Sequence, residues 1–186
     1  EDAEPLMRRT LELKVEIYGP DHPSTLNSVN NLGELNDQLG KDAEAEAWHR
    51  QALAARTRVL GPGHVRTLQS RKCLASCLSS QGRHAEAERL AAAGVAEAVK
   101  ALGERDLVTL SLQDARAVAL TGLRRAGEAE ALLRRVLAIL DERKAKGEDA
   151  GEGDAYATDA RVHLGMALAR LRRFAEAEPL LVENVP

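Results

Sequence analysis

The chain has 186 residues, of which 44% are hydrophobic, 30% are charged and only 2% are aromatic. So few aromatic side chains argue against a β-sandwich core and against a base-stacking surface for nucleic acids. The net charge of -3, without a basic run, argues against non-specific nucleic-acid binding. No apolar stretch approaches the roughly 20 residues that span a bilayer, so we expect neither a nucleic-acid nor a membrane partner.

A short segment centred on alanine recurs along the chain and gives every predicted element its register. Its copies lie 42, 42, 42 and 48 residues apart, and their central residues are Ala3, Ala45, Ala87, Ala129 and Ala177. A nearly constant period of this length is typical of a protein built from stacked supersecondary units. Abundant Ala, Leu, Arg and Glu favour helices in each unit.

The first predicted element is a helix over 2–18, which ends at Gly19-Pro20 because glycine caps a helix and proline forbids its continuation. Two helices, A and B, follow in each later unit. The first full unit covers 24–60, with helix A at 24–39 and helix B at 42–60. The second covers 66–102 and divides in the same way.

The third and fourth full units are predicted at 107–144 and 155–184, so the chain is one solenoid domain over 1–186. The longer last gap places an inserted loop at 144–154, whose Gly- and acid-rich composition does not favour burial in a core. We interpret it as a tolerated surface insertion, with a binding loop or a hinge as the alternatives. The chain begins within a helical pattern, which indicates a segment of a longer protein.

Small residues and charges complete the unit. The centre of helix A holds a small residue that permits a close helix crossing, in turn Gly33, Ala75, Ala117 and Gly165. A cation precedes each later alanine segment, at Lys41, Arg83, Arg125 and Arg173, where we expect it to oppose the dipole of helix A. Glutamates beside each alanine have the right sign for the start of helix B.

These residues resemble the tetratricopeptide repeat. Gly33 in helix A, followed by Ala45 and Ala52 in helix B, matches the family pattern, and the 42-residue period with the phrase GPDHPSTLNSVNNLGEL is similar to the kinesin-light-chain variety. HEAT repeats have a comparable period but lack this pattern of alanine and glycine. The resemblance implies an all-α, right-handed solenoid whose A helices line a concave groove that binds peptides or proteins.

The resemblance also assigns groove positions. It places residues 2, 5, 9 and 12 of each helix A, counted from Leu26 in the first unit, on the concave side. From these, with Asn31 of the family phrase, we predict the peptide-binding residues Asn27, Asn30, Asn31, Glu34, Gln69, Lys72 and Asp114. An amide can clamp a peptide backbone because it both donates and accepts. A solvated surface role for Asn30 remains the alternative, since later units lack the asparagine pair.

Other candidate chemistry has a structural interpretation. Cys73 and Cys77 share a helix face, but zinc needs four ligands, and Cys77 matches the apolar positions of Leu35 and Ala119. His22 and His64 occupy equivalent turns, about 8–10 Å apart in stacked helices, which is too far to share an ion. The repeated glutamate pairs do not define a single active site. We therefore predict no catalytic residues, no metal and no cofactor.

The sequence thus favours a protein-interaction scaffold with a protein or peptide partner. Two cysteines without a disulfide framework or a secretory signal favour a cytoplasmic setting. The alternative function is the regulatory or sensory region of a larger bacterial signalling enzyme, such as a Ser/Thr kinase, a caspase-like protease or a nucleotide-binding regulator. A third alternative is self-assembly through the open ends of the stack. The oligomeric state is not predicted.

Overall fold

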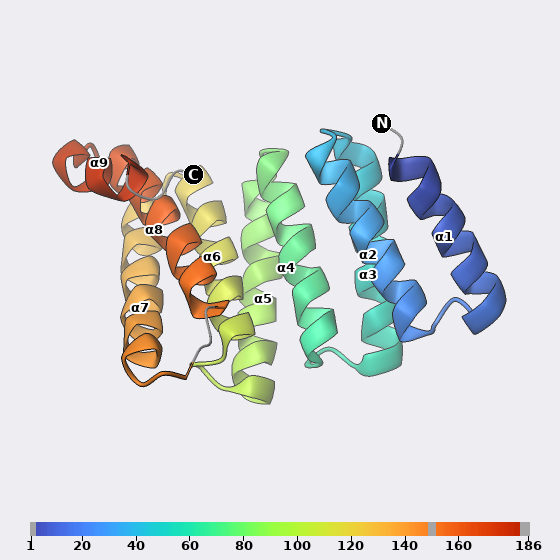
Figure 1. Cartoon of the computed structure of the whole chain (residues 1–186). Helices are drawn as coiled ribbons and strands as arrows, with labels where there is room; N and C mark the ends of the chain where they lie inside the picture. The colour runs from blue at the N-terminus through green and yellow to red at the C-terminus, as the bar shows by residue number, and fades with distance from the viewer. Residues whose placement is uncertain (1–2, 149–151, 183–186) are drawn as a thin grey trace.

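Nine helices follow one another through residues 3–148 and 152–182, which are the residues that the computed structural model describes, and no strand occurs there (Figure 1). Their alternation between B and A types confirms the all-α fold class and the helix-turn-helix repeat. The bounds are α1 (Ala3–Tyr18), α2 (Pro23–Gln38), α3 (Asp42–Leu60), α4 (Val65–Ser80), α5 (His84–Leu102), α6 (Leu107–Gly122), α7 (Ala126–Ala145), α8 (Glu152–Arg170) and α9 (Phe174–Val182).

The A helices form the closer-packed layer of the stack. Each of the helices α2, α4 and α6 contacts the next A helix, whereas within the described residues no two B helices come as close to one another. The B helices α3, α5 and α7 instead pack between the A helix of their own repeat and the A helix of the next. Because the inner side of an arc is the shorter one, this difference in spacing places the A helices on the concave side.

The helices that flank the insertion extend into the segment that the sequence predicted to be a loop. We expected a loop at 144–154, but Lys144 and Ala145 complete α7, and residues 152–154 belong to the first turn of α8. Helix α8 therefore begins three residues before the expected position, 155. The expected positions 2, 183 and 184, and residues 149–151 of the insertion, lie outside the described part of the chain.

Threonine explains one of the recurring landmarks of the repeat. Helices α1 and α5 end at Gly19 and Gly103, whose φ angles of 86° and 92° lie in the region that favours glycine. The hydroxyl of Thr25 donates to the Gly19 carbonyl at 2.9 Å, and that of Thr109 to the Gly103 carbonyl at 2.8 Å. Threonine thus ties the start of each of these A helices to the turn before it.

The recurring cations link neighbouring repeats. Lys41 donates to Glu4 at 2.6 Å, Arg83 to Glu46 at 2.6 Å and Arg173 to Glu130 at 2.8 Å, in each case to the B helix of the preceding repeat. Arg125 breaks the series, since it pairs with Glu128 of its own repeat. Our interpretation of these cations and glutamates through helix dipoles was therefore incomplete, because most of them form bridges between repeats.

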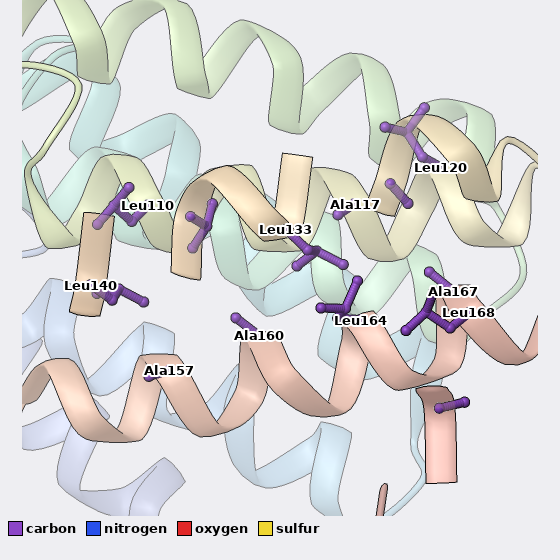
Figure 2. Packing of buried hydrophobic residues seen from close by; sticks show 13 residues of the cluster. Leu110, Ala117, Leu120, Leu133, Leu140, Ala157, Ala160, Leu164, Ala167 and Leu168 are labelled. Carbon is purple, nitrogen blue, oxygen red and sulfur yellow. The ribbon is translucent and has the colours of Figure 1, made fainter. Parts of the chain in front are cut away.

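The largest apolar cluster lies in the C-terminal half of the stack. It joins α6, α7 and α8, and Figure 2 shows Leu133 and Leu164 pointing toward one another between these helices. The recurring alanines are fully buried at Ala45, Ala87 and Ala129, as a close crossing requires. Within the described residues, no helix is both long and apolar enough to cross a membrane.

Candidate functional site

Two adjoining hollows follow the A helices. The first, which we call the N-terminal hollow, has a volume of about 400 Å³ and is lined by ten residues of α2, α3, α4 and α6 together with Tyr156 of α8. The second, the C-terminal hollow, has a volume of about 430 Å³ and is lined by residues of α4, α6 and α8. Lys72 lines both hollows, so the two adjoin at this side chain.

All seven predicted groove residues line these hollows. Asp114 lies in the C-terminal hollow, and the other six lie in the N-terminal one, namely Asn27, Asn30, Asn31, Glu34, Gln69 and Lys72. They come from helices α2, α4 and α6, which the sequence places about 42 residues apart. The structure thus brings the predicted residues together on one face, while their binding of a peptide remains a prediction.

Asn30 is neither a solvated surface residue nor a free clamp. Its side chain is buried, its Nδ2 donates to Glu34 at 2.8 Å, and its Oδ1 accepts from the Ser70 hydroxyl at 3.2 Å. A peptide that used this amide would have to displace these partners. Asn31, by contrast, is exposed at the edge of the same hollow and offers its amide directly.

Arg56 is a groove residue that our sequence reasoning missed. It belongs to helix B (α3), and its side chain reaches between α2 and α4, where it donates to Asn27 Oδ1 at 2.7 Å, to Ser70 Oγ at 2.7 Å and to the Arg66 carbonyl at 3.1 Å. Burial and the charge of Arg66 lower the pKa of Arg56. The signal was present in the register, because Arg56 stands where the next two repeats have Ala98 and Leu140.

The two cysteines are poorly suited to chemistry at this site. Burial, with the nearby charge of Glu34, raises the pKa of Cys73 to about 11, and burial with Asp37 raises that of Cys77 to about 12. Both side chains are therefore thiols near neutral pH and weak nucleophiles. Cys77 is buried, in agreement with the packing role that we expected.

An ion pair joins two A helices in the C-terminal hollow. His163 Nδ1 of α8 lies 2.8 Å from Asp114 Oδ1 of α6. Burial lowers the pKa of His163, but the hydrogen bond and the charge of Asp114, together with Asp159, outweigh it and leave the pKa raised. Local sequence gives no signal for His163, because its partner Asp114 lies 49 residues away.

The turn histidines, for which the sequence suggested a structural role, cap helices. His22 Nδ1 accepts from the Ser24 backbone N–H at 3.2 Å, and His64 Nδ1 accepts from the Arg66 N–H at 3.1 Å, so both serve as N-caps. Across the described residues, His, Cys, Asp and Glu side chains form no group of three or more that could hold a metal ion.

Helical hairpins in a constant register, stacked so that one layer lines a continuous groove, define an α-solenoid repeat protein. The family model for the tetratricopeptide repeat matches residues 1–58 and 38–96, which together cover residues 1–96 of the 186. The chain belongs to the tetratricopeptide repeat family. A comparison with curated protein sequences gave no match.

Solved structures support the kinesin-light-chain-like variety. A Podosopora anserina protein, described as a kinesin light chain with nearly identical TPR-like repeats, is 25% identical with a TM-score of 0.70, and a point variant of it has a TM-score of 0.73. The match covers 98% of this chain and 84% of that one. The structure of BtubC (BKLC) from P. vanneervenii is 17% identical, with a TM-score of 0.73. The match covers 98% of this chain and 70% of BtubC, and at this identity it shows the fold alone.

Proposed function

We propose that this chain is a non-catalytic scaffold that binds a peptide or an extended protein segment along its concave groove. Tetratricopeptide repeats generally mediate protein–protein interaction. The observation that carries the proposal is that the two hollows adjoin at Lys72, and that side chains of successive A helices line both of them. Such a surface suits an extended partner, because stacked repeats form an extended concave face.

The polar character of the N-terminal hollow supports recognition of a peptide backbone. Asn31 and Gln69 line it, and an amide side chain can donate to a carbonyl and accept from an N–H at the same time. The C-terminal hollow adds Ala115 and Val118 beside Asp114, so it offers both apolar contact and charge. Asn27, Glu34 and Lys72 complete the proposed contact set, with Asn30 as a buried support for Glu34.

The proposal is tested by affinity capture with matched lysine variants. Lys72→Ala removes a cation that lines both hollows, and Lys100→Ala removes an exposed cation at the end of α5, outside either hollow. We expect a partner that is retained by the parent and by Lys100→Ala to be lost or weakened with Lys72→Ala and with Gln69→Ala. Equal retention by all four forms would show that the partner binds elsewhere.

The cytoplasmic setting remains part of this proposal. The alternative role, as the regulatory region of a larger bacterial signalling enzyme, is not favoured by any contact within the described residues, and we do not propose it.

A further inference from the structure

Arg56 is a buried cation that forms no ion pair within the described residues, although the charge of Glu34 acts on it. Its exposed fraction is 3%, and its three acceptors are an amide oxygen, a hydroxyl and a backbone carbonyl, all of them neutral. Burying a charge is costly unless an opposite charge compensates it. The acceptors around Arg56 satisfy hydrogen bonds but leave its positive charge facing the N-terminal hollow, which it lines.

The stack does not need a cation at this position. Ala98 and Leu140 stand at the equivalent places in the next two repeats, where they are 0% and 2% exposed within apolar surroundings. Lys14, at the equivalent place in the partial repeat, reaches Ser28 at 2.8 Å just as Arg56 reaches Ser70. Lys14 does not line the N-terminal hollow, however. The contact between a cation and a serine therefore recurs in two repeats, and Arg56 differs from Lys14 in that it also lines the hollow.

The guanidinium keeps two N–H donors free. Of its five donors, both on Nη1 and one on Nη2 are used, which leaves Nε–H and one Nη2–H. Nε and Nη2 form the side-on edge with which a guanidinium binds an oxyanion in a bidentate manner, and Nε–H on this edge makes no hydrogen bond with any described residue. The same edge is used within this protein by Arg125, whose Nε and Nη2 each donate to Glu128 at 2.7 Å.

The charges around the hollow indicate the kind of oxyanion. Arg56, Arg66 and Lys72 are its cations and Glu34 is its one acidic residue, so these four side chains sum to a charge of +2 (three minus one). A phosphate monoester carries close to two negative charges at neutral pH and offers three acceptor oxygens. A carboxylate would neutralise only half of this charge.

We infer that the N-terminal hollow is an oxyanion subsite in which Arg56, with Arg66 and Lys72, holds a phosphate monoester group of the bound partner. The inference rests on the proposed function, since it assigns one chemical feature of the segment that occupies the groove. It identifies Arg56 as the residue that determines this specificity.

The test uses inorganic phosphate as the probe and the whole chain as the receptor. Sodium phosphate is titrated at pH 7.5 and constant ionic strength, and the arginine Nε–H resonances are followed by ¹H–¹⁵N spectroscopy, with sodium acetate as the second arm. We expect a saturable shift of the Arg56 resonance with phosphate, at concentrations at least about tenfold lower than with acetate. No saturation with phosphate, or equal affinity for acetate, would overturn the assignment to phosphate.

Two matched variants locate the site. Arg56→Leu introduces the residue that the third full repeat already has, and it should weaken phosphate binding at least about tenfold. Lys14→Leu makes the same change in the partial repeat and should leave the affinity unchanged. Because these variants remove the cation, their binding is read from the backbone amides of Asn27 and Gln69. Binding that survives Arg56→Leu places the anion elsewhere and refutes the inference.

Further controls keep the test decisive. Circular dichroism establishes whether Arg56→Leu folds; if it does not, Lys72→Ala, which changes a partly exposed side chain, replaces it and should weaken phosphate binding severalfold. Failure of the two proposals can be distinguished. If a partner is captured through Lys72 but phosphate does not bind, the scaffold function stands and the phosphate subsite is refuted. If phosphate binds but no partner is captured, the subsite stands and the scaffold function is refuted.

Discussion

Gly33 of helix α2 lies directly against the imidazole of His49 in helix α3. An ideal Cβ built on Gly33 would be 2.5 Å from His49 Cε1 and 2.6 Å from Nδ1, and His49 is fully buried, with Nε2 held 2.7 Å from Asp37 Oδ2. The equivalent pair in the next repeat is Ala75 and Ala91. The small residue and its partner across the hairpin therefore have to be matched in size.

The first prediction concerns this match. Gly33→Ala should lower the free energy of unfolding by about 1–3 kcal/mol, because the added methyl group cannot be placed without moving the ring. In the His49→Ala background, Gly33→Ala recreates the alanine pair of the next repeat, so it should change the free energy of unfolding little or not at all. Urea unfolding of the four proteins measures the coupling. An equal cost in both backgrounds would contradict the assigned contact.

The second prediction concerns the turn between helices A and B. Arg124 has a φ of 62°, whereas the first two full repeats place Gly40 and Gly82 here, with φ of 67° and 77°. Arg124→Gly should raise the free energy of unfolding by about 1 kcal/mol, since glycine tolerates the left-handed conformation. Arg124→Ala removes the same side chain but keeps a Cβ, so it should bring no gain. If both variants gain equally in thermal unfolding, the effect does not come from φ.

A third prediction follows from the helix caps. His64 caps α4 through a 3.1 Å hydrogen bond, and the next repeat uses Asp106, whose Oδ1 accepts from the Val108 N–H at 2.8 Å. His64→Asp should stabilise the protein by about 0.5–1 kcal/mol, because aspartate is a preferred cap and its charge complements the helix N-terminus. His64→Ala should destabilise it by a similar amount. Calorimetric melting of the three proteins would show this order, and a destabilised Asp variant would refute it.

The fourth prediction is a pH dependence. Because the folded pKa of His163 is raised, its ion pair with Asp114 contributes stability fully below the unfolded value, near 6.5, and loses it as the pH rises through the folded pKa. The difference in unfolding free energy between the parent and His163→Gln should therefore shrink from pH 5.5 to pH 9. Taking the difference cancels the other titrating groups. A gap that is constant with pH would exclude a raised pKa.

The last prediction tests the register of the repeat. Ala87 is fully buried at a crossing with Leu74, Leu78 and Ala119. Ala87→Arg should cost more than about 3 kcal/mol, because it combines overpacking with a buried charge. Ala85→Arg, two residues earlier on an exposed position, should change stability by no more than about 0.5 kcal/mol. Thermal unfolding that is identical for the two variants would mean that the register is wrong.

The local sequence pattern was sufficient to predict most of the fold. Alanines at a nearly constant spacing and the Gly-Pro stop at Gly19 predicted the helix order, because close crossings and helix ends depend on residues near one another in the chain. The same register was enough to select the groove positions, since stacking places equivalent residues of each helix A on one face. The extra turn at the start of α8 was missed, because residues 152–154 follow a Gly- and acid-rich segment whose composition favours a loop.

Contacts between repeats were decided by the tertiary structure alone. Arg83 pairs with Glu46, 37 residues earlier, and His163 pairs with Asp114, 49 residues earlier, and neither distance can be read from a local pattern. Arg56 stands at a register position that is apolar in the next two repeats, but only the stack places its side chain between α2 and α4. The sequence determined which helices form and in what order. The packing of one hairpin on the next decided which charges are buried, because burial depends on neighbours that are distant in the chain.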